Sequence, residues 1–296
     1  MDPELVIEAR LRDMGGFSVR RVLPTTRRKL IGPFIFYDHL CRTVFEPGQG
    51  LDVRPHPHIS LATVTYLFEG SFMHRDSLGY AQLIEPGAVN WMIAGRGVAH
   101  SERTPPELRQ SGGALHGIQC WVALPREHEE IEPSFVHHPR ASIPRVALEG
   151  VELTVIAGSA YGRTSPVQVL SPTLYVHARL SALASVAVDE QHEERAIYVA
   201  SGSISLEADG PEYGEGALVI LPRGVQVTLS SRYGADAMLL GGAPLDGDRH
   251  IYWNFVSSSL ERLEQAKRDW RERRFGTVVG DEQELIPLPE EPGNPR

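Results

Sequence analysis

Short apolar runs and alternating apolar and polar positions, separated by turn residues, dominate the first half of the chain. The run LATVTYLF at residues 61–68 is rich in strand-forming residues and ends at a Glu-Gly turn. The alternating segment FSVRRVL at 17–23 and the aromatic segment GPFIFYDH at 32–39 also favour strands. Short strands that recur between turn signals are typical of an antiparallel sandwich or barrel.

The same rhythm returns after a polar, proline-containing stretch at residues 125–144, which we interpret as a linker. We expect strands in this second half at 151–156, 173–176, 195–199, 203–207 and 217–221. Its layout resembles that of the first half, but His192 stands there without a His-x-Glu partner. The second half is therefore predicted to be a structural twin that binds no metal.

One helix is predicted near the end of the chain, at residues 258–275. Ser258 and Glu261 match a capping box at its start. One stripe of the helix is apolar and consists of Leu260, Leu263, Ala266 and Trp270. The acidic, proline-containing tail at 280–296 is expected to lie over the surface or to be partly disordered.

Length, charge and cysteine content restrict the class of protein. The 296 residues suit two domains. A net charge of −9 argues against direct nucleic-acid binding, which needs a basic surface. Only Cys41 and Cys120 are present, so no disulfide framework is expected and a reducing, cytoplasmic setting fits. The sequence contains neither a signal-peptide pattern nor an apolar run near the ~20 residues of a membrane helix, so we expect no membrane association.

Two pairs of polar residues carry the candidate chemistry. His56 and His58 form the first pair, and His100 and Glu102 form the second, just after a glycine-rich turn at 95–97. Side chains two positions apart on a strand point to the same face. Two such strands can close on one metal ion with three imidazole nitrogens and one carboxylate oxygen. The alternative interpretation is four ordinary polar residues on a half-buried sheet.

Further residues around these pairs have two interpretations each. His74, Arg75 and Asp76 could approach the mouth of the site, but a hydrogen-bonded hairpin end is the interpretation we favour. Four apolar residues could line a pocket for a flat aromatic substrate or could be plain core, and they are Phe72, Met73, Trp91 and Met92.

Several segments of the chain resemble the pirin family of bicupins. They are VRRVLPTTRRKLIGPFIFYDHL, LDVRPHPHISLATVTYLFEGSFMHRDSLG, NWMIAGRGVAHSERTPPEL, LHGIQCWVALP and HIYWNFVSSSLERLEQAKRDW. This resemblance spans almost the whole chain. It implies an all-β bicupin of two antiparallel β-barrel (jelly-roll) domains with a C-terminal helix. We assign residues 1–130 to an N-terminal metal-binding cupin domain, and 131–296 to a C-terminal cupin-like domain without metal that includes the helix and tail.

The resemblance also implies a ligand set and a metal. The family's four metal ligands fall on His56, His58, His100 and Glu102. The general cupin pattern places a glutamate soon after the second histidine, where this chain has Thr63, so the carboxylate comes from Glu102, as in pirins. The implied cofactor is one divalent metal ion, Fe(II) first, with Mn, Ni, Co or Zn also compatible with these ligands.

Two classes of function follow from the resemblance. Some members are similar to quercetin 2,3-dioxygenases, so a small aromatic substrate such as a flavonol is expected, with Glu102 as the base that takes its proton. Glu102 could equally be a permanent ligand without an acid–base role. Other members are regulators, which predicts, as the alternative, a redox-sensing protein that binds a transcription factor or an enzyme. We expect the metal-dependent dioxygenase first, as a monomer.

Overall fold

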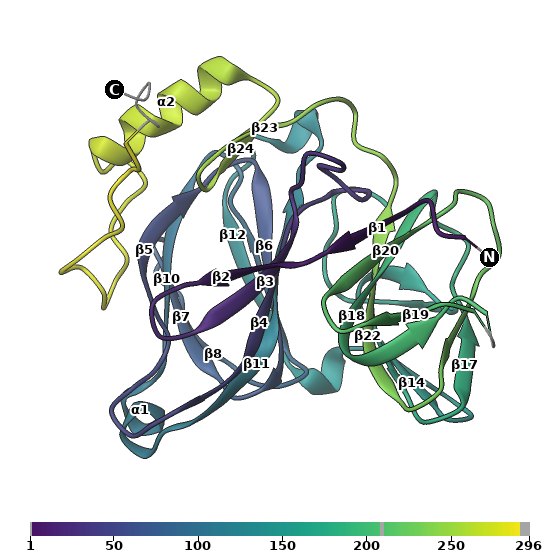
Figure 1. Cartoon of the computed structure of the whole chain (residues 1–296). Helices are drawn as coiled ribbons and strands as arrows, with labels where there is room; N and C mark the ends of the chain where they lie inside the picture. Colours follow the sequence, from purple (N-terminus) through teal and green to yellow (C-terminus); the bar gives the residue numbers. More distant parts are fainter. Residues whose placement is uncertain (1, 208–209, 291–296) are drawn as a thin grey trace, which may run out of the picture.

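The computed structural model describes residues 2–207 and 210–290 and consists mainly of strands in two barrels, as predicted (Figure 1). The first barrel contains β2 (Arg10–Asp13), β3 (Ser18–Leu23), β4 (Phe34–Phe45), β5 (Asp52–His58), β6 (Leu61–Glu69), β7 (Phe72–Asp76), β8 (Ala81–Ile84), β9 (Val89–Ile93), β10 (Val98–Arg103), β11 (Gly113–Ala123) and β12 (Ser134–His138). The second contains β1 (Leu5–Glu8), β13 (Arg145–Leu148), β14 (Val151–Ala160), β15 (Arg163–Thr164), β16 (Thr173–Leu180), β17 (Ala184–Ala187), β18 (Glu194–Ser205), β19 (Glu212–Gly214), β20 (Ala217–Leu221), β21 (Thr228–Ser231) and β22 (Ala235–Gly242).

The remaining elements connect strands or follow the second barrel. The connecting elements are a short helix, α1 (Pro106–Ser111), and two 3₁₀ turns, Arg126–His128 and Arg140–Ser142. After the second barrel come β23 (His250–Tyr252), β24 (Phe255–Ser257) and helix α2 (Leu260–Arg271). In Figure 1 this last segment returns to the first barrel, and α2 lies over it.

Two sheets form the first barrel. A seven-stranded sheet has the order β12-β9-β6-β11-β4-β3-β2, and a four-stranded sheet has the order β5-β10-β7-β8. Along the strands, side chains alternate between the barrel interior and the outside, as the period of two requires. The four-stranded sheet carries both predicted polar pairs, so their strands lie side by side.

Strands are exchanged between the two halves of the chain. Near the N-terminus, β1 pairs with β20 of the second barrel, with Leu5 opposite Ile220. Within the stretch predicted to be a linker, β12 pairs with β9 of the first barrel, with Phe135 opposite Met92. The linker prediction is therefore wrong for residues 134–138, because a short alternating segment among prolines completes a sheet edge. The domain boundary at 130 stays a prediction.

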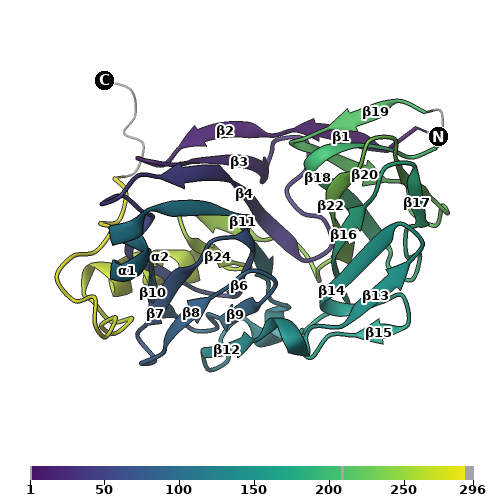
Figure 2. The same cartoon turned by 90° about the horizontal axis from the view of Figure 1, so that it is seen from below.

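The two barrels lie side by side (Figure 2). They share a continuous apolar core. From the first barrel it includes Val64 and Ile118, and from the second it includes Tyr175, Leu218 and Leu240, all fully buried. A core made by both sheets leaves little room for independent movement, since burial of apolar area is the main stabilising term in folding.

The helix predicted at residues 258–275 is present but spans only Leu260–Arg271, so it begins two residues later and ends four residues earlier than expected. Ser259 is the N-cap, because its hydroxyl accepts a hydrogen bond from the backbone N–H of Arg262. The capping box assigned to Ser258 and Glu261 is therefore wrong. Leu260 of the predicted stripe is also largely exposed, at 62%.

The other three stripe residues bury the helix against the first barrel. Leu263, Ala266 and Trp270 pack in one apolar cluster with Ile59 of the first barrel and Phe255 of β24. Helix propensity alone would stabilise twelve residues weakly, so this packing is what holds α2 in place.

The tail that follows α2 lies over the first barrel, as expected for its described part. The backbone N–H of Ile286 donates to the carbonyl of Pro55 in β5, at 2.8 Å. Arg103 of β10 donates to both carboxylate oxygens of Asp281, at 2.6 and 2.9 Å. The last part of the predicted tail, residues 291–296, lies outside the described residues. Within residues 2–207 and 210–290, none of the helices has the length and apolar character needed to cross a bilayer.

A buried carboxylate fixes the C-terminal segment to the first barrel. Glu129 accepts hydrogen bonds from the hydroxyl of Ser257 and from the backbone and hydroxyl of Ser258, at 3.0–3.1 Å. Its Oε1 also lies 2.7 Å from Nε of Arg249, whose side chain has no exposed area. A buried arginine without its carboxylate partner is strongly destabilising.

We predict that Glu129→Ala lowers the free energy of unfolding by about 3 kcal/mol, because it leaves the buried Arg249 with one carboxylate fewer. Urea unfolding of the whole chain measures the change. Glu127→Ala is the matched control, since the Glu127 side chain is 79% exposed and should contribute little. Equal stability of the two variants would contradict the structural role of Glu129.

Candidate metal centre

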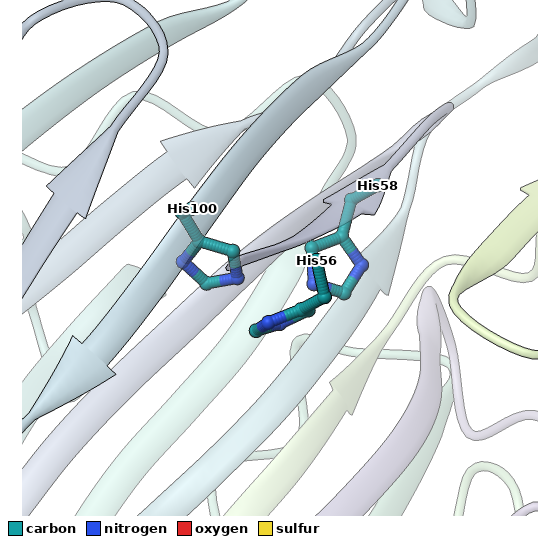
Figure 3. A group of neighbouring side chains, drawn as sticks. All are labelled: His56, His58 and His100. Atoms are coloured by element: carbon teal, nitrogen blue, oxygen red, sulfur yellow. The ribbon is translucent and has the colours of Figure 1, made fainter. Parts of the chain in front are cut away.

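Three imidazoles converge inside the first barrel (Figure 3). His56 and His58 project from β5, and His100 projects from the adjacent strand β10, directly opposite His56 in the antiparallel register. One ligand atom of each ring lies within 4.8 Å of those of the other two. Exposed fractions of 7%, 1% and 1% place all three rings in the interior. The structure therefore brings the three predicted histidines together at one point.

Hydrogen bonds leave the Nε2 atoms of these rings free to bind a cation. Nδ1 of His56 donates to the carbonyl of Arg54 at 2.9 Å, and Nδ1 of His58 donates to the carbonyl of Asn254 at 3.1 Å. A backbone carbonyl accepts only, so each Nδ1 carries the proton and each Nε2 keeps its lone pair. Buried Nε2 of His100 has no hydrogen-bond partner among the described residues. Unpaired buried lone pairs that face one another are what a metal ion would satisfy.

Burial keeps the three imidazoles neutral. It lowers the pKa of His56 to about 4, and it lowers the pKa values of His58 and His100 well below the usual range. The other histidines of the cluster act in the same direction on His58 and His100. Neutral imidazole is the form that binds metal ions, so the cluster is ready for a divalent ion at neutral pH.

A carboxylate–histidine pair on β7 orients the third imidazole. Nδ1 of His100 lies 3.4 Å from Nδ1 of His74, whose Nε2 lies 3.0 Å from Oδ2 of Asp76. When His74 donates Nε2–H to Asp76, its Nδ1 accepts the Nδ1–H of His100. That order of donors again leaves the Nε2 lone pair of His100 unused, the usual arrangement behind a metal-bound histidine.

Asp76 also holds the turn after β7, as the sequence suggested. Its Oδ1 accepts the backbone N–H groups of Leu78 and Tyr80, at 2.9 and 3.0 Å. The hairpin-end interpretation of His74 and Asp76 is thus correct but incomplete, because the same carboxylate reaches the metal cluster through His74. Arg75, between them, lies against the tail at Gly280.

Glu102 lies beside the three-histidine cluster. Its carboxylate oxygens are not among the ligand atoms that all lie within 4.8 Å of one another. Its Oε1 accepts a hydrogen bond from Nε2 of Gln119 at 2.6 Å, and it lines the same cavity as His56 and His58. Burial raises the pKa of this carboxyl, while the bonds from Gln119 and Thr65 oppose that rise. Its role as fourth ligand stays a prediction.

A cavity of about 180 Å³ adjoins the cluster. One wall is aromatic: the ring of Phe36 stacks on Trp121 at 4.0 Å between centroids, and Trp121 meets His58 edge to face at 5.1 Å. Arg21 caps the Phe36 ring and donates twice to Asp38. A mainly apolar cavity with a few polar groups is typical of a small-molecule site.

Residues far apart in the sequence complete this cavity. Phe72, one of the four candidate apolar residues, lines it, whereas Trp91 and Met92 belong to apolar core clusters. Sequence reasoning did not single out five other lining residues: Gln119, Trp121, Trp253, Asn254 and Ile286. No spacing pattern connects them with the histidines, because the last three come from the C-terminal segment folded over β5.

Comparison with known proteins identifies the family. The pirin family model matches residues 16–122, and the model of the pirin C-terminal cupin domain matches residues 175–276. A pirin-like protein of Caulobacter vibrioides is 47% identical over 290 residues, which cover 97% of this chain and 99% of that protein. The chain belongs to the pirin family.

Solved structures agree with this pirin assignment. A crystal structure of a quercetin 2,3-dioxygenase from Acinetobacter baumannii superimposes with a TM-score of 0.90 at 32% identity, covering 99% of this chain and 97% of that one. A nickel(II) complex of the Escherichia coli pirin YhhW covers 81% of this chain and 99% of that one, with a TM-score of 0.64 at 20% identity. The latter likeness shows the shared fold.

The residues present suit a divalent ion. The donor set is rich in nitrogen and oxygen. It consists of three neutral imidazoles, whose Nδ1 protons are fixed by hydrogen bonds, and a neighbouring carboxylate. One buried Nε2, that of His100, has no hydrogen-bond partner among the described residues. Such donors accept iron(II), manganese(II), nickel(II), cobalt(II) or zinc(II) and lack the thiolates of structural zinc sites. This pirin chain therefore has a candidate metal centre in its first barrel.

We predict that His56→Ala removes most of the bound metal and leaves the fold intact, because one of three convergent lone pairs is lost while the shared core is untouched. Metal content by mass spectrometry and thermal unfolding by circular dichroism check the two parts. His192→Ala is the matched control, since His192 lies in the second barrel and bonds the carbonyl of Ser159. Unchanged metal content in His56→Ala would overturn the ligand assignment.

A second prediction concerns Asp76→Asn. The two backbone N–H groups at Oδ1 should hold the amide oxygen, so the amide NH₂ faces His74 and forces its proton onto Nδ1. That proton competes with the Nδ1–H of His100 and favours the tautomer of His100 that cannot bind metal. We expect nickel(II) affinity to fall by about 10- to 100-fold.

Competition with a chromophoric chelator measures that affinity. Asp248→Asn, a change at an exposed aspartate outside the cavity, serves as the control. Nickel affinities of Asp76→Asn and the control that match the unaltered chain would show that Asp76 only holds the turn.

Proposed function

We propose that this pirin-family chain is an iron(II)-dependent oxidoreductase similar to quercetin 2,3-dioxygenase, which cleaves a flavonol or a related flat aromatic substrate. The observation that carries this proposal is the cavity beside the three histidines, with its aromatic wall and a carboxylate. A regulator could function with its metal site covered, whereas an enzyme needs this space. The likeness to the Acinetobacter baumannii quercetin 2,3-dioxygenase supports the same substrate class.

The chain's own residues divide the work in this proposal. His56, His58 and His100, with Glu102 as the fourth ligand, hold the ion. A bound iron(II) ion would supply the Lewis acidity and the redox chemistry that dioxygen-dependent cleavage needs. The stacked rings of Phe36 and Trp121 orient the flat substrate with its hydroxyl toward the histidines.

Glu102 is the proposed proton acceptor. Two carboxylates, Asp38 and Glu102, line the cavity. Arg21 donates to both oxygens of Asp38, whereas Glu102 forms none of the ion pairs described with an arginine. Its raised pKa makes it a better base than an exposed carboxylate. Gln119 fixes one oxygen and thereby directs the other.

The tail forms part of the wall of this cavity. Ile286 lines it, and the backbone of Ile286 is held by Pro55 and by Nε1 of Trp270, which donates to its carbonyl at 3.0 Å. Exclusion of water strengthens electrostatic interactions inside a site and limits side reactions. The tail therefore acts as part of the active-site wall in this proposal.

The alternative function is a redox-sensing regulator that binds a transcription factor or an enzyme partner. One arrangement favours it: Arg103, next to Glu102 on β10, forms ion pairs with Asp281 and Glu284 of the tail. A change of charge at the metal would alter the electrostatic interaction between Arg103 and this surface segment. The monomeric state, the cytoplasmic location and the lack of direct nucleic-acid binding stay predictions from the sequence.

The proposal predicts oxygen uptake after anaerobic loading with iron(II) and addition of quercetin, at a rate that matches the loss of flavonol absorbance. Glu102→Gln keeps the size of the side chain but cannot accept the proton, so we expect a rate lower by about 100-fold or more at equal iron content. Glu107→Ala, on the exposed face of α1, is the control.

Iron content must be measured for every variant in that experiment. If Glu102→Gln loses its iron, Glu102 is a ligand first, and its role as a base is then tested at saturating iron. A fully iron-loaded chain that takes up no oxygen with quercetin would contradict the dioxygenase and favour the regulator.

A further inference from the structure

A second polar hollow lies between the two barrels, away from the histidine cluster. It has a volume of about 210 Å³. The first barrel supplies Tyr66 and Phe68 from β6 and the turn at Pro86 and Gly87, and the second supplies polar side chains of β13, β14 and β16 with Arg140. Figure 2 shows these strands of the second barrel facing the first. None of its lining residues is part of the cavity beside the histidines.

The strand register explains why polar groups gather on this face of the second barrel. Thr154 stands opposite both Arg145 on β13 and His177 on β16. Arg179 stands opposite Glu152 and Asp236 in the same way. Opposite residues on antiparallel strands share a face, so these positions form one polar surface. It is set within a face that is otherwise apolar core.

A chain of hydrogen bonds crosses between the barrels at this hollow. The hydroxyl of Tyr66 lies 3.1 Å from Nδ1 of His177, and Nε2 of His177 lies 2.8 Å from Oδ1 of Asp236. Asp236 also accepts from Arg179 at 3.1 Å and from the hydroxyl of Ser201 at 3.1 Å. Asp236 therefore orients His177, whose Nδ1 accepts the hydroxyl proton of Tyr66.

Positive charge exceeds negative charge around the hollow. Arg179 is neutralised by Asp236, and Arg145 lies 3.6 Å from Glu152. Arg140 forms no ion pair among the described residues, and its side chain packs along Gly87. All three guanidinium groups act on the hydroxyl of Tyr66 and oppose the effect of burial, which raises its pKa to about 12. This excess stands out in a chain whose net charge is −9.

We propose that this interdomain hollow is a binding site for a small oxyanion, a carboxylate or phosphate group, held by the guanidinium groups of Arg140 and Arg145. Guanidinium groups match the two-oxygen geometry of both anions. The volume of the hollow equals that of several water molecules, so a small anion fits in it. Both barrels line the hollow, so the anion would lie between them.

Isothermal titration calorimetry of the whole chain with inorganic phosphate and with succinate tests this proposal. Sodium chloride of equal ionic strength is the blank. We expect one saturable site for at least one of the two anions. The double variant Arg140→Ala/Arg145→Ala should weaken binding by about tenfold or more, since two charged hydrogen-bond donors are lost.

Two further variants make the result specific. Arg163→Ala on β15 removes an exposed arginine outside the hollow and should leave anion binding unchanged. Arg145→Lys keeps the positive charge but loses the two-donor geometry of the guanidinium, so it should weaken binding less than the double variant does. Comparison of phosphate with succinate distinguishes the two sources of the anion.

Three outcomes would overturn the proposal. One is the absence of saturable heat with both anions at millimolar concentrations. Another is an equal loss of binding in Arg163→Ala, which would indicate general charge attraction. The third is binding that requires loaded metal and disappears in His56→Ala, which would place the anion at the metal centre. The proposal stands independently of the dioxygenase activity, because the titration requires no turnover.

Discussion

The antiparallel register of β5 with β10 is the constraint on which the candidate metal centre depends, because it sets His56 directly opposite His100. A slip by one residue would turn the side chains of β5 to the other face. As β5 is an edge strand, one side of it has no neighbour in the sheet. The C-terminal segment supplies that support, through the bond from Ile286 to Pro55 and the bridge between Ile59 and Phe255.

Contacts with neighbouring segments also decide which nitrogen of each imidazole carries the proton. The carbonyl of Asn254, between β23 and β24, fixes the tautomer of His58, and the pair His74–Asp76 does the same for His100. Burial disfavours the protonated, charged forms of these imidazoles. The three neutral rings therefore direct their Nε2 lone pairs toward one another, and no hydrogen-bond donor of the described residues lies between them. A divalent cation removes that conflict, which is why the cluster is preorganised for metal rather than for a proton.

The alternation of apolar and polar residues was sufficient to predict most strands, although those expected at 195–199 and 203–207 are one strand, β18 (Glu194–Ser205). The pirin resemblance supplied the two barrels. The sequence was insufficient for contacts between distant segments. The residues around His58 do not indicate its hydrogen bond to the carbonyl of Asn254. Local patterns also do not predict that β12 pairs with the first barrel or that β1 pairs with the second. The N-cap was assigned one residue too early, since adjacent serines are equivalent candidates and only the structure shows that Ser259 accepts from Arg262.

Strand β6 connects the two polar regions of the molecule. Thr65 faces the barrel interior, where it bonds Glu102, and Tyr66, the next residue, faces the second barrel and bonds His177. Neighbouring side chains on a strand point in opposite directions, so one strand contributes to both sites. Thr65 and Tyr66 are adjacent, so the surroundings of Glu102 and the wall of the interdomain hollow are separated along β6 by a single peptide unit.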